Sequence, residues 1–175
     1  GVLARDPRRC KPGQAQYTLC CDDETGGTVD DLIAYLRADD DLLLIPNAAN
    51  CAEVARRLSE AAPAGVEVRN VHRDYAVLAV QGTRSDETLR TLGLPTGHDY
   101  MAFDVASWEG TAVTVCRTGY TGERGYELVV PADAGLAWGA ARRQLTARCD
   151  ELLRAFARLR MPARRLATGE LHALE

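Results

Sequence analysis

The stretch Arg117-Thr-Gly-Tyr-Thr-Gly-Glu-Arg-Gly-Tyr-Glu127 is a polar loop, punctuated by glycine, between two short apolar runs. Glycine recurs at every third position, at 119, 122 and 125, and this residue permits positive φ and a close approach of the backbone to a ligand or a neighbouring strand. Two tyrosines add flat rings with hydroxyl tips, and the two ends of the loop carry opposite charges. The pattern predicts a β-hairpin whose tip is either simply polar or a place where a ligand binds.

The apolar runs beside this loop predict strands over residues 112–117 and 126–131, and similar runs recur along the chain. Further strands are expected over residues 16–21, 28–36, 41–46, 66–71, 75–80 and 105–108. Helices are expected from Asn50 towards Pro63, over residues 85–92, and from about residue 133 onward. Because several strands follow one another through turns, an α+β domain with largely antiparallel sheets and flanking helices fits better than a doubly wound parallel sheet.

Length and composition narrow the class of protein. A chain of 175 residues suffices for one domain, or for one lobe of a larger fold. The net charge of −4 argues against a nucleic acid partner, and no apolar run reaches the roughly 18 residues of a membrane span. The first residues lack an apolar signal core, so a cytoplasmic protein is expected. The 6 cysteines show no CxxC pattern, which predicts free thiols and no metal site.

The predicted strand over residues 28–36 carries the side chains best suited to chemistry. Its alternation places Asp31 on the same face as Tyr35, and Asp30 on the opposite face. An aspartate flanked by Leu32 and Ile33 is expected to be partly desolvated, although both aspartates could also be solvated residues that close a hairpin. The histidines have no partner at a spacing typical of nucleophile or metal sites, so a reaction would depend on carboxylates, tyrosines and a bound cofactor.

Five motifs resemble, in order and approximate spacing, those of aminomethyltransferase, the T protein of the glycine cleavage system. They are the loop that ends at Glu127, Gly13-Gln-Ala-Gln-Tyr-Thr18, Gly26-Gly-Thr-Val-Asp-Asp-Leu-Ile-Ala-Tyr35, Pro46-Asn-Ala-Ala-Asn50 and Leu78-Ala-Val-Gln-Gly82. The resemblance implies a folate-binding fold over residues 13–145. It also implies that a one-carbon unit passes from the aminomethyl group on the lipoyl arm of the H protein to tetrahydrofolate, with release of ammonia and formation of 5,10-methylenetetrahydrofolate.

The resemblance implies roles for individual residues as well. Asp31 matches the catalytic aspartate of the family, which is hydrogen-bonded in the pterin region near the nitrogens that receive the carbon. The positions that match the folate pocket are Tyr17, Tyr35, Asn47, Arg117, Tyr120 and Glu127. Among them, Glu127 is expected to accept hydrogen bonds from the amino group and the ring N–H of the pterin. We expect Asp31 and the loop that ends at Glu127 to converge around a hollow of pteridine size.

The sequence also departs from the family. Residues 1–12 read as a non-matching leader and residues 146–175 as a non-matching tail with a helical period. T proteins are about twice as long, and several of their segments have no counterpart in this sequence. These departures suggest a truncated gene product with weak or no activity in isolation.

Two alternatives to an aminomethyltransferase remain open. One is a noncatalytic folate-binding or interaction module that keeps the core of the pocket without turnover. The other is a remnant of a folate-dependent sarcosine or dimethylglycine oxidising enzyme, although the chain has no G-x-G-x-x-G fingerprint for a flavin.

Overall fold

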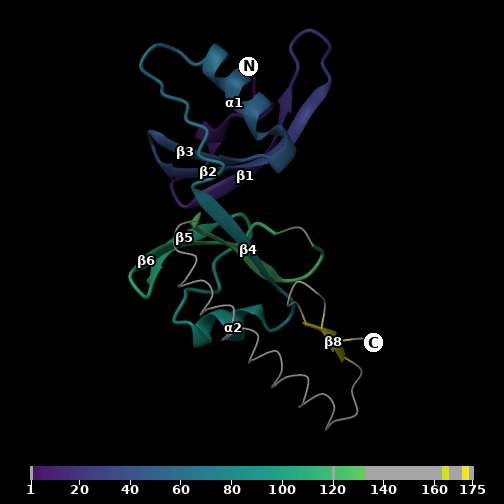
Figure 1. Ribbon diagram of the computed structural model, residues 1–175, viewed down its shortest axis with the longest axis vertical. Helices are drawn as coiled ribbons and strands as arrows, with labels where there is room; N and C mark the ends of the chain where they lie inside the picture. Colours follow the sequence, from purple (N-terminus) through teal and green to yellow (C-terminus); the bar gives the residue numbers. More distant parts are fainter. Residues whose placement is uncertain (1, 120, 133–162, 166–170, 174–175) are drawn as a thin grey trace. The chain divides into compact units, whose positions relative to one another are not determined.

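The computed structural model describes residues 2–119, 121–132, 163–165 and 171–173 of the chain, which divides into two compact units. The first unit contains Gly1–Asp74 and Met101–Phe103, and the second contains Tyr75–Tyr100 and Asp104–Glu175. Within their described parts, each unit combines an antiparallel sheet with an α-helix (Figure 1). The expected α+β class with largely antiparallel sheets is therefore confirmed.

The sheet of the first unit has three antiparallel strands in sequence order. They are β1 (Gln14–Cys21), β2 (Thr28–Ala38) and β3 (Asp41–Ile45). Asp22 closes the turn between β1 and β2, because its carboxylate accepts from the backbone N–H of Thr25 at 2.9 Å. These strands agree with the sequence prediction, since hairpin strands depend mainly on local alternation and on turn residues.

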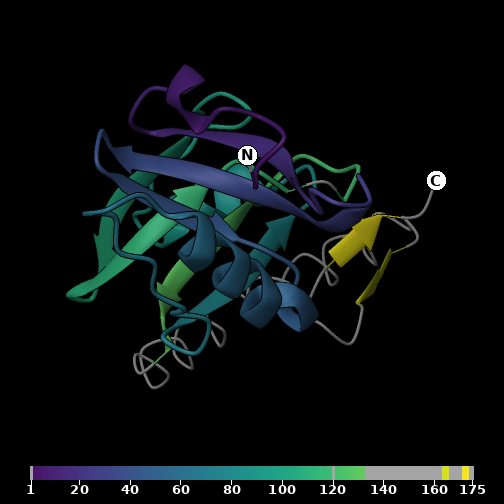
Figure 2. The same cartoon turned by 90° about the horizontal axis from the view of Figure 1, so that it is seen from above.

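One face of this sheet is covered by α1 (Cys51–Ala61), which follows the short 3-10 helix η2 (Ala48–Asn50). Val54 of α1 is buried against Leu32 of β2 and Cys20 of β1. Figure 2 shows α1 lying along this face of the sheet. The helix stops before Pro63, as predicted, because proline removes a backbone donor and disfavours the helical conformation of the residue before it.

The first residues of the chain add to the edge of β1 rather than standing apart from the sheet. The N–H of Ala4 donates to the carbonyl of Leu19 at 2.9 Å, and the N–H of Cys21 donates to the carbonyl of Val2 at 3.2 Å. A 3-10 helix, η1 (Pro7–Arg9), then leads towards β1. The boundary that the sequence suggests between a leader and the domain at residue 13 stays a prediction.

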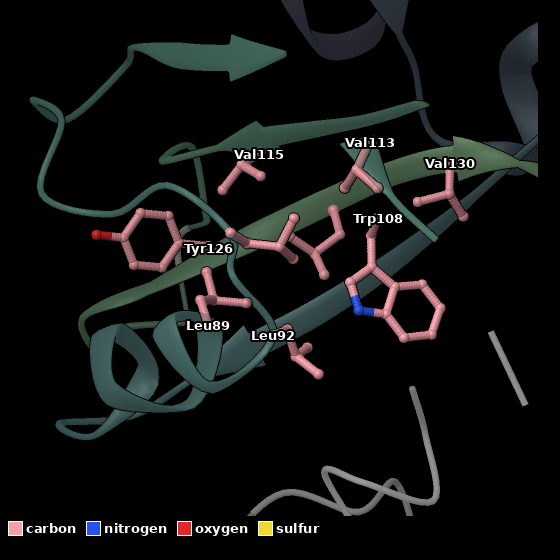
Figure 3. Close-up of a cluster of buried hydrophobic side chains, with 9 residues drawn as sticks. Leu89, Leu92, Trp108, Val113, Val115, Tyr126 and Val130 are labelled. Atoms are coloured by element: carbon pink, nitrogen blue, oxygen red, sulfur yellow. The ribbon is translucent and has the colours of Figure 1, made fainter. Parts of the chain in front are cut away.

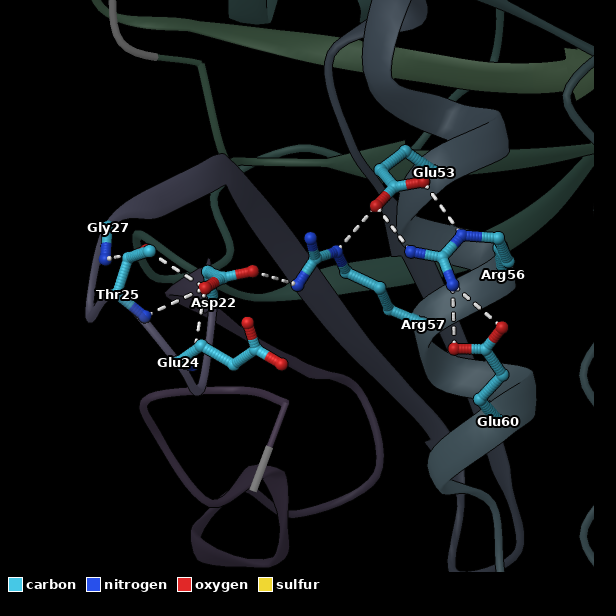
Figure 4. Close-up of polar contacts among 8 residues, drawn as sticks. All are labelled: Asp22, Glu24, Thr25, Gly27, Glu53, Arg56, Arg57 and Glu60. Carbon is cyan, nitrogen blue, oxygen red and sulfur yellow. Dashed lines mark hydrogen bonds and ion pairs between the residues drawn. The ribbon is translucent and has the colours of Figure 1, made fainter.

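A network of charged side chains joins the β1–β2 turn to α1 (Figure 4). Arg57 lies between two carboxylates, 2.9 Å from Asp22 and 2.6 Å from Glu53. Glu53 also pairs with Arg56 at 2.7 Å, and Arg56 reaches Glu60 one turn further along the helix, also at 2.7 Å. Among these pairs, the one between Arg57 and Asp22 crosses from α1 to the turn and holds the hairpin tip against the helix, while the others lie within α1.

The network predicts a loss of stability in acid. Hydrogen bonds from Thr25, and then from Arg57, lower the pKa of Asp22 to about 2, and hydrogen bonds from Arg56 and Arg57 lower the pKa of Glu53 to about 2. A carboxylate with a lowered pKa stabilises the fold above its unfolded value, near 4, and loses that contribution as the pH falls towards 2. We expect Arg57→Gln to lower the melting temperature at pH 6 and to have a much smaller effect at pH 2.5.

The control for this prediction is Arg69→Gln, because Arg69 is exposed and lies 3.6 Å from Glu67 in a loop. An exposed pair at this distance contributes little to stability. Thermal unfolding of both variants from pH 2.5 to pH 6 measures the difference. Equal effects of Arg57→Gln at both ends of this range would contradict the assignment.

The second unit contains a four-stranded antiparallel sheet in the order β4-β7-β6-β5. Its elements are β4 (Tyr75–Gln81), α2 (Ser85–Thr91), β5 (Phe103–Trp108), β6 (Thr111–Cys116) and β7 (Gly125–Pro131). A further pair of antiparallel strands, β8 (Ala163–Arg165) and β9 (Leu171–Ala173), lies within the tail that was expected to be helical. The helix expected from about residue 133 lies outside the described residues.

The core of the second unit lies between α2 and one face of its sheet (Figure 3). Its buried side chains are Leu89, Leu92, Leu94, Trp108, Val113, Val115, Tyr126, Leu128 and Val130. The hydroxyl of Tyr126 points out of this apolar cluster (Figure 3). No helix in the described part of the chain is long and apolar enough to span a membrane.

The strand predicted over residues 66–71 is wrong. This segment pairs with no strand in the described part of the chain, and Val66 is 55% exposed. Its alternating valines match the period of a strand, but a strand forms only where a neighbour satisfies its backbone groups. The segment instead links α1 to β4 as a loop.

Candidate functional site

The two adjacent aspartates of β2 point to opposite faces of the first sheet, as the alternation predicts. Asp31 lies opposite Leu19 and Asp30 opposite Cys20 in the register with β1. Asp30 is only 3% exposed, whereas Asp31 is exposed. The expected partial desolvation of Asp31 is therefore wrong, because the buried carboxylate belongs to its neighbour on the side covered by α1.

Asp30 receives a set of donors from the segment that follows β3. The backbone N–H and the side-chain Nδ2 of Asn47 each donate to it at 2.9 Å, and Nδ2 of Asn50 donates at 2.7 Å. Asn50 occupies the N-cap position of α1, as predicted, but its side chain makes no cap hydrogen bond. A buried carboxylate needs such donors more than an exposed helix end does, because an unsatisfied buried charge is very costly.

This arrangement predicts a structural role for Asp30. Asp30→Asn would place an amide NH2 group against donors and remove the charge, so we expect a loss of about 1.5–3 kcal/mol in the free energy of unfolding. Asp31→Asn is the matched control, since the same change at an exposed position should cost less than about 0.5 kcal/mol. Urea unfolding of both variants measures the difference, and equal losses would contradict the distinction.

The face that carries Asp31 also carries Tyr17, which lies opposite Ile33 in the register. The hydroxyl of Tyr17 donates to Oδ2 of Asp31 at 3.1 Å, and Nδ2 of Asn47 donates to Oδ1 at 3.1 Å. Both donors are themselves exposed, with Tyr17 at 44%. Three of the predicted site residues thus lie together, and their hydrogen bonds hold an accessible carboxylate in a defined orientation.

Tyr35, another predicted site residue, has a different environment. Its side chain is 1% exposed, and its ring meets that of Phe103 edge to face with centroids 5.6 Å apart. Phe103 belongs to the short segment that returns to β1, where its N–H donates to the carbonyl of Gly13 at 2.9 Å. Within this unit Tyr35 therefore packs against Phe103 on the face of the sheet that also carries Asp31.

The remaining predicted residues belong to the second unit. Oε2 of Glu127 accepts from the hydroxyl of the buried Thr118 at 2.7 Å, a bond that joins the two ends of the glycine-rich loop. Arg117 donates to the carbonyl of His98 at 3.0 Å. Tyr120 lies outside the described residues. Because Asp31 and Glu127 belong to different units, their convergence on one hollow stays a prediction.

The polar surroundings of Glu127 include a thiol that the sequence did not single out. Cys116 lies opposite Glu127 in the register of β6 and β7. Burial raises the pKa of Cys116 to about 12, and the neighbouring carboxylate adds to this effect. The thiol is therefore neutral at physiological pH and serves as a small apolar wall beside Glu127.

His98, for which the sequence shows no catalytic or metal-ligand partner, has a side chain that is only 10% exposed. Its ring packs edge to face against Tyr126, with centroids 5.2 Å apart, and burial lowers the pKa of His98. The hydroxyl of Tyr126 accepts from the N–H of Gly97 at 2.8 Å and donates to Asp86 at 2.7 Å. Asp86 in turn forms an ion pair with Arg124 at 2.8 Å. Asp86 lies in α2 and Arg124 in the glycine-rich loop, so this pair connects the loop to the helix.

Cys51 and His72 form a second contact that the sequence did not predict. Sγ of Cys51 lies 3.4 Å from Nδ1 of His72, although 21 residues separate them. Burial raises the pKa of Cys51, which disfavours the reactive thiolate. The described cysteines form no disulfide, and no three His, Cys, Asp or Glu side chains within the described ranges gather as a metal site.

Comparison with known proteins assigns the chain to a family. The model of the GCVT N-terminal domain family matches residues 1–146. An aminomethyltransferase of a Parafrankia species is 61% identical over 137 residues, which cover 78% of this chain and 37% of that protein. An aminomethyltransferase of Mycolicibacterium paratuberculosis is 58% identical over 140 residues, which cover 79% of this chain and 38% of that protein.

The chain therefore spans less than two fifths of the length of these curated relatives. The family match covers the first unit, the second unit as far as residue 146, and every predicted site residue, from Tyr17 to Glu127. With 146 of its 175 residues matched, the chain belongs to the GCVT N-terminal domain family.

Proposed function

We propose that this chain is the folate-binding part of an aminomethyltransferase of the glycine cleavage system. One observation carries the proposal: the exposed carboxylate of Asp31 is held by hydrogen bonds from Tyr17 and Asn47, on a strand inside the matched family domain. The relatives named aminomethyltransferase, at 56–61% identity, support the same reading.

The donors and acceptors of the two predicted half-sites fit the chemistry of a reduced pterin. That ring system carries N–H groups and an amino group, and carboxylates are the side chains that accept from such donors most strongly. Asp31 would accept from the nitrogens that receive the carbon, and Glu127 from the amino group and the ring N–H. The bond from Thr118 orients the Glu127 carboxylate without neutralising it.

In the proposed reaction, the aminomethyl group comes from the lipoyl arm of a partner H protein. The bonds from this carbon to the lipoyl sulfur and to its amino nitrogen break, and the carbon forms bonds to two nitrogens of tetrahydrofolate. Of the two protons that these nitrogens lose, one goes to the sulfur, which becomes a thiol, and the other goes to the amine, which leaves as ammonia. The role of Asp31 is to orient the accepting nitrogens and to hold a proton during this exchange. Positioning of bound reactants of this kind contributes several kcal/mol to catalysis without a protein nucleophile.

A second candidate is a noncatalytic module that binds folate without turnover. In this candidate the hydrogen-bonded carboxylate of Asp31 serves as a binding group and not as a proton-transfer group. The two candidates make the same prediction for binding and opposite predictions for transfer. They are therefore separated by the transfer assay and not by titration.

Isothermal titration of the purified chain with tetrahydrofolate tests the part that both candidates share. We expect saturable binding, and a Kd at least tenfold higher in Glu127→Ala, because the pterin donors would lose a charged acceptor. Glu67→Ala is the matched control, since Glu67 is 77% exposed in a loop. A folded chain that produces no heat of binding would refute the proposed function.

A further inference from the structure

We propose that Gln81 is a positioning residue that sets the conformation of the glycine-rich loop and, through it, the place of Glu127. The inference rests on the proposed function, because it deepens the role of the same site. Gln81 is the last residue of β4, where it lies opposite Gly125 of β7. Its side chain therefore starts at the point where the loop returns to the sheet.

Both ends of the Gln81 amide are used. Nε2 donates to the carbonyl of Tyr126 at 3.1 Å, and Oε1 accepts from the hydroxyl of Thr121 at 3.1 Å. These partners lie 45 and 40 residues further along the chain, the first in β7 and the second within the loop. One planar group thus ties the exposed tip of the loop to the start of β7.

The glycines of the loop form the socket for this amide. A Cβ atom at Gly119 would lie 2.6 Å from Nε2 of Gln81, and a Cβ atom at Gly125 would lie 2.7 Å from its Cα and would also overlap Oε1. Only Gly122, among these three glycines, has positive φ, at +87°. Gly125 is therefore required by space, because its Cβ would meet a backbone atom, whereas a Cβ at Gly119 would displace the flexible end of the Gln81 side chain and disturb its hydrogen bonds.

The backbone next to the socket is held at the same place. The N–H of Gly82 donates to the carbonyl of Arg124 at 2.8 Å. The residue after Gln81 is therefore also hydrogen-bonded to the loop. The peptide group whose carbonyl accepts from Gln81 is the one that joins Tyr126 to Glu127. If the orientation of this peptide group is fixed, the direction in which the Glu127 side chain leaves the strand is fixed as well. The hydroxyl of Thr118 then donates to the Glu127 carboxylate.

The test compares loop order with folate binding in two variants. Gln81→Met keeps the length of the side chain and removes both hydrogen bonds, and Thr121→Val removes only the bond at the exposed tip. Gln14→Met is the matched control, since Oε1 of Gln14 also accepts one bond, from the N–H of Lys11 at 2.9 Å, in the other unit. The readouts are hydrogen exchange of the 117–127 segment in the free protein and titration with tetrahydrofolate.

We expect exchange of the segment to be about tenfold faster in Gln81→Met and about threefold faster in Thr121→Val, with no change in Gln14→Met. The Kd for tetrahydrofolate should rise about tenfold in Gln81→Met while its melting temperature stays close to that of the unchanged chain. Unchanged exchange in Gln81→Met would overturn the inference. Faster exchange with an unchanged Kd would also overturn it, because Gln81 would then be merely structural.

A double substitution tests the socket itself. Gly119→Ala should loosen the segment in the unchanged chain and have almost no effect in a Gln81→Ala background, because the three atoms nearest to the new Cβ all belong to the Gln81 side chain. Gly125→Ala should not be rescued, since it also meets the Gln81 Cα. Equal rescue of both, or of neither, would contradict the geometry.

These outcomes are distinguishable from a failure of the proposed function. A chain that never binds tetrahydrofolate would end the proposed function and, with it, the role of Gln81 in that site. The exchange results in the free protein would then still show whether Gln81 orders the loop.

Discussion

Asp31→Asn is expected to lower one-carbon transfer at least 100-fold while leaving the fold intact. A positioned proton-transfer group contributes about 10²–10⁴-fold to a reaction rate, and asparagine keeps the size of the side chain while removing its charge and basicity. The bonds from Tyr17 and Asn47 reach the carboxylate oxygens, so one of them can still be accepted by the amide oxygen. We expect the Kd for tetrahydrofolate to change less than the transfer rate.

Transfer is best measured in a single turnover, with the chain in excess over aminomethyl-loaded, lipoylated H protein and with tetrahydrofolate present. Ammonia release then reports even slow transfer. Asp41→Asn is the matched control in the same sheet, because Asp41 makes an exposed ion pair with Arg37 at 2.8 Å. A change of less than threefold in Asp31→Asn would refute the catalytic role of Asp31 and would favour the noncatalytic module.

Leu128→Ala is expected to lower the free energy of unfolding by about 2–5 kcal/mol, the range found when a buried leucine is truncated and its cavity only partly collapses. Leu128 is wholly buried at the centre of β7, opposite Leu78 of β4 and Val115 of β6. Since β7 lies between those two strands, neither neighbour can move in without disturbing its own pairing.

Urea unfolding followed by tryptophan emission in a Trp138→Phe background isolates this effect, because Trp108 lies in the same buried cluster. Leu42→Ala provides the same chemical change at a position that is 37% exposed, and we expect it to cost about 1 kcal/mol or less. If both substitutions cost the same, Leu128 is not the centre of a packed core.

Much of the fold could be predicted from the sequence, because hairpins depend on short-range alternation and on turn residues. The strands ending at Cys21, Ala38 and Ile45 follow from such patterns. Local patterns could not show that residues 66–71 form no strand. A strand needs a neighbouring strand to pair with, and which strands become neighbours depends on how the whole sheet assembles. The sequence also did not predict β8 and β9 within the tail.

The candidate site was predicted in part. The motifs identified Tyr17, Asp31 and Asn47, and the structure brings these three together. The motifs did not predict that Tyr35 is buried against Phe103, or that Gly125 is required by space and not by its backbone conformation. Such features depend on atoms that approach from distant parts of the chain.

The sequence by itself determined which face of β2 carries Asp31, because successive side chains of a strand point to opposite sides whatever surrounds them. Only the tertiary structure decided that Asp30 is the buried carboxylate and that Gln81 occupies the socket of the loop. The physical reason is that burial and side-chain hydrogen bonding depend on which distant segments pack together. The donors to Asp30 lie 17 and 20 residues away, and those contacts exist only once α1 covers the sheet.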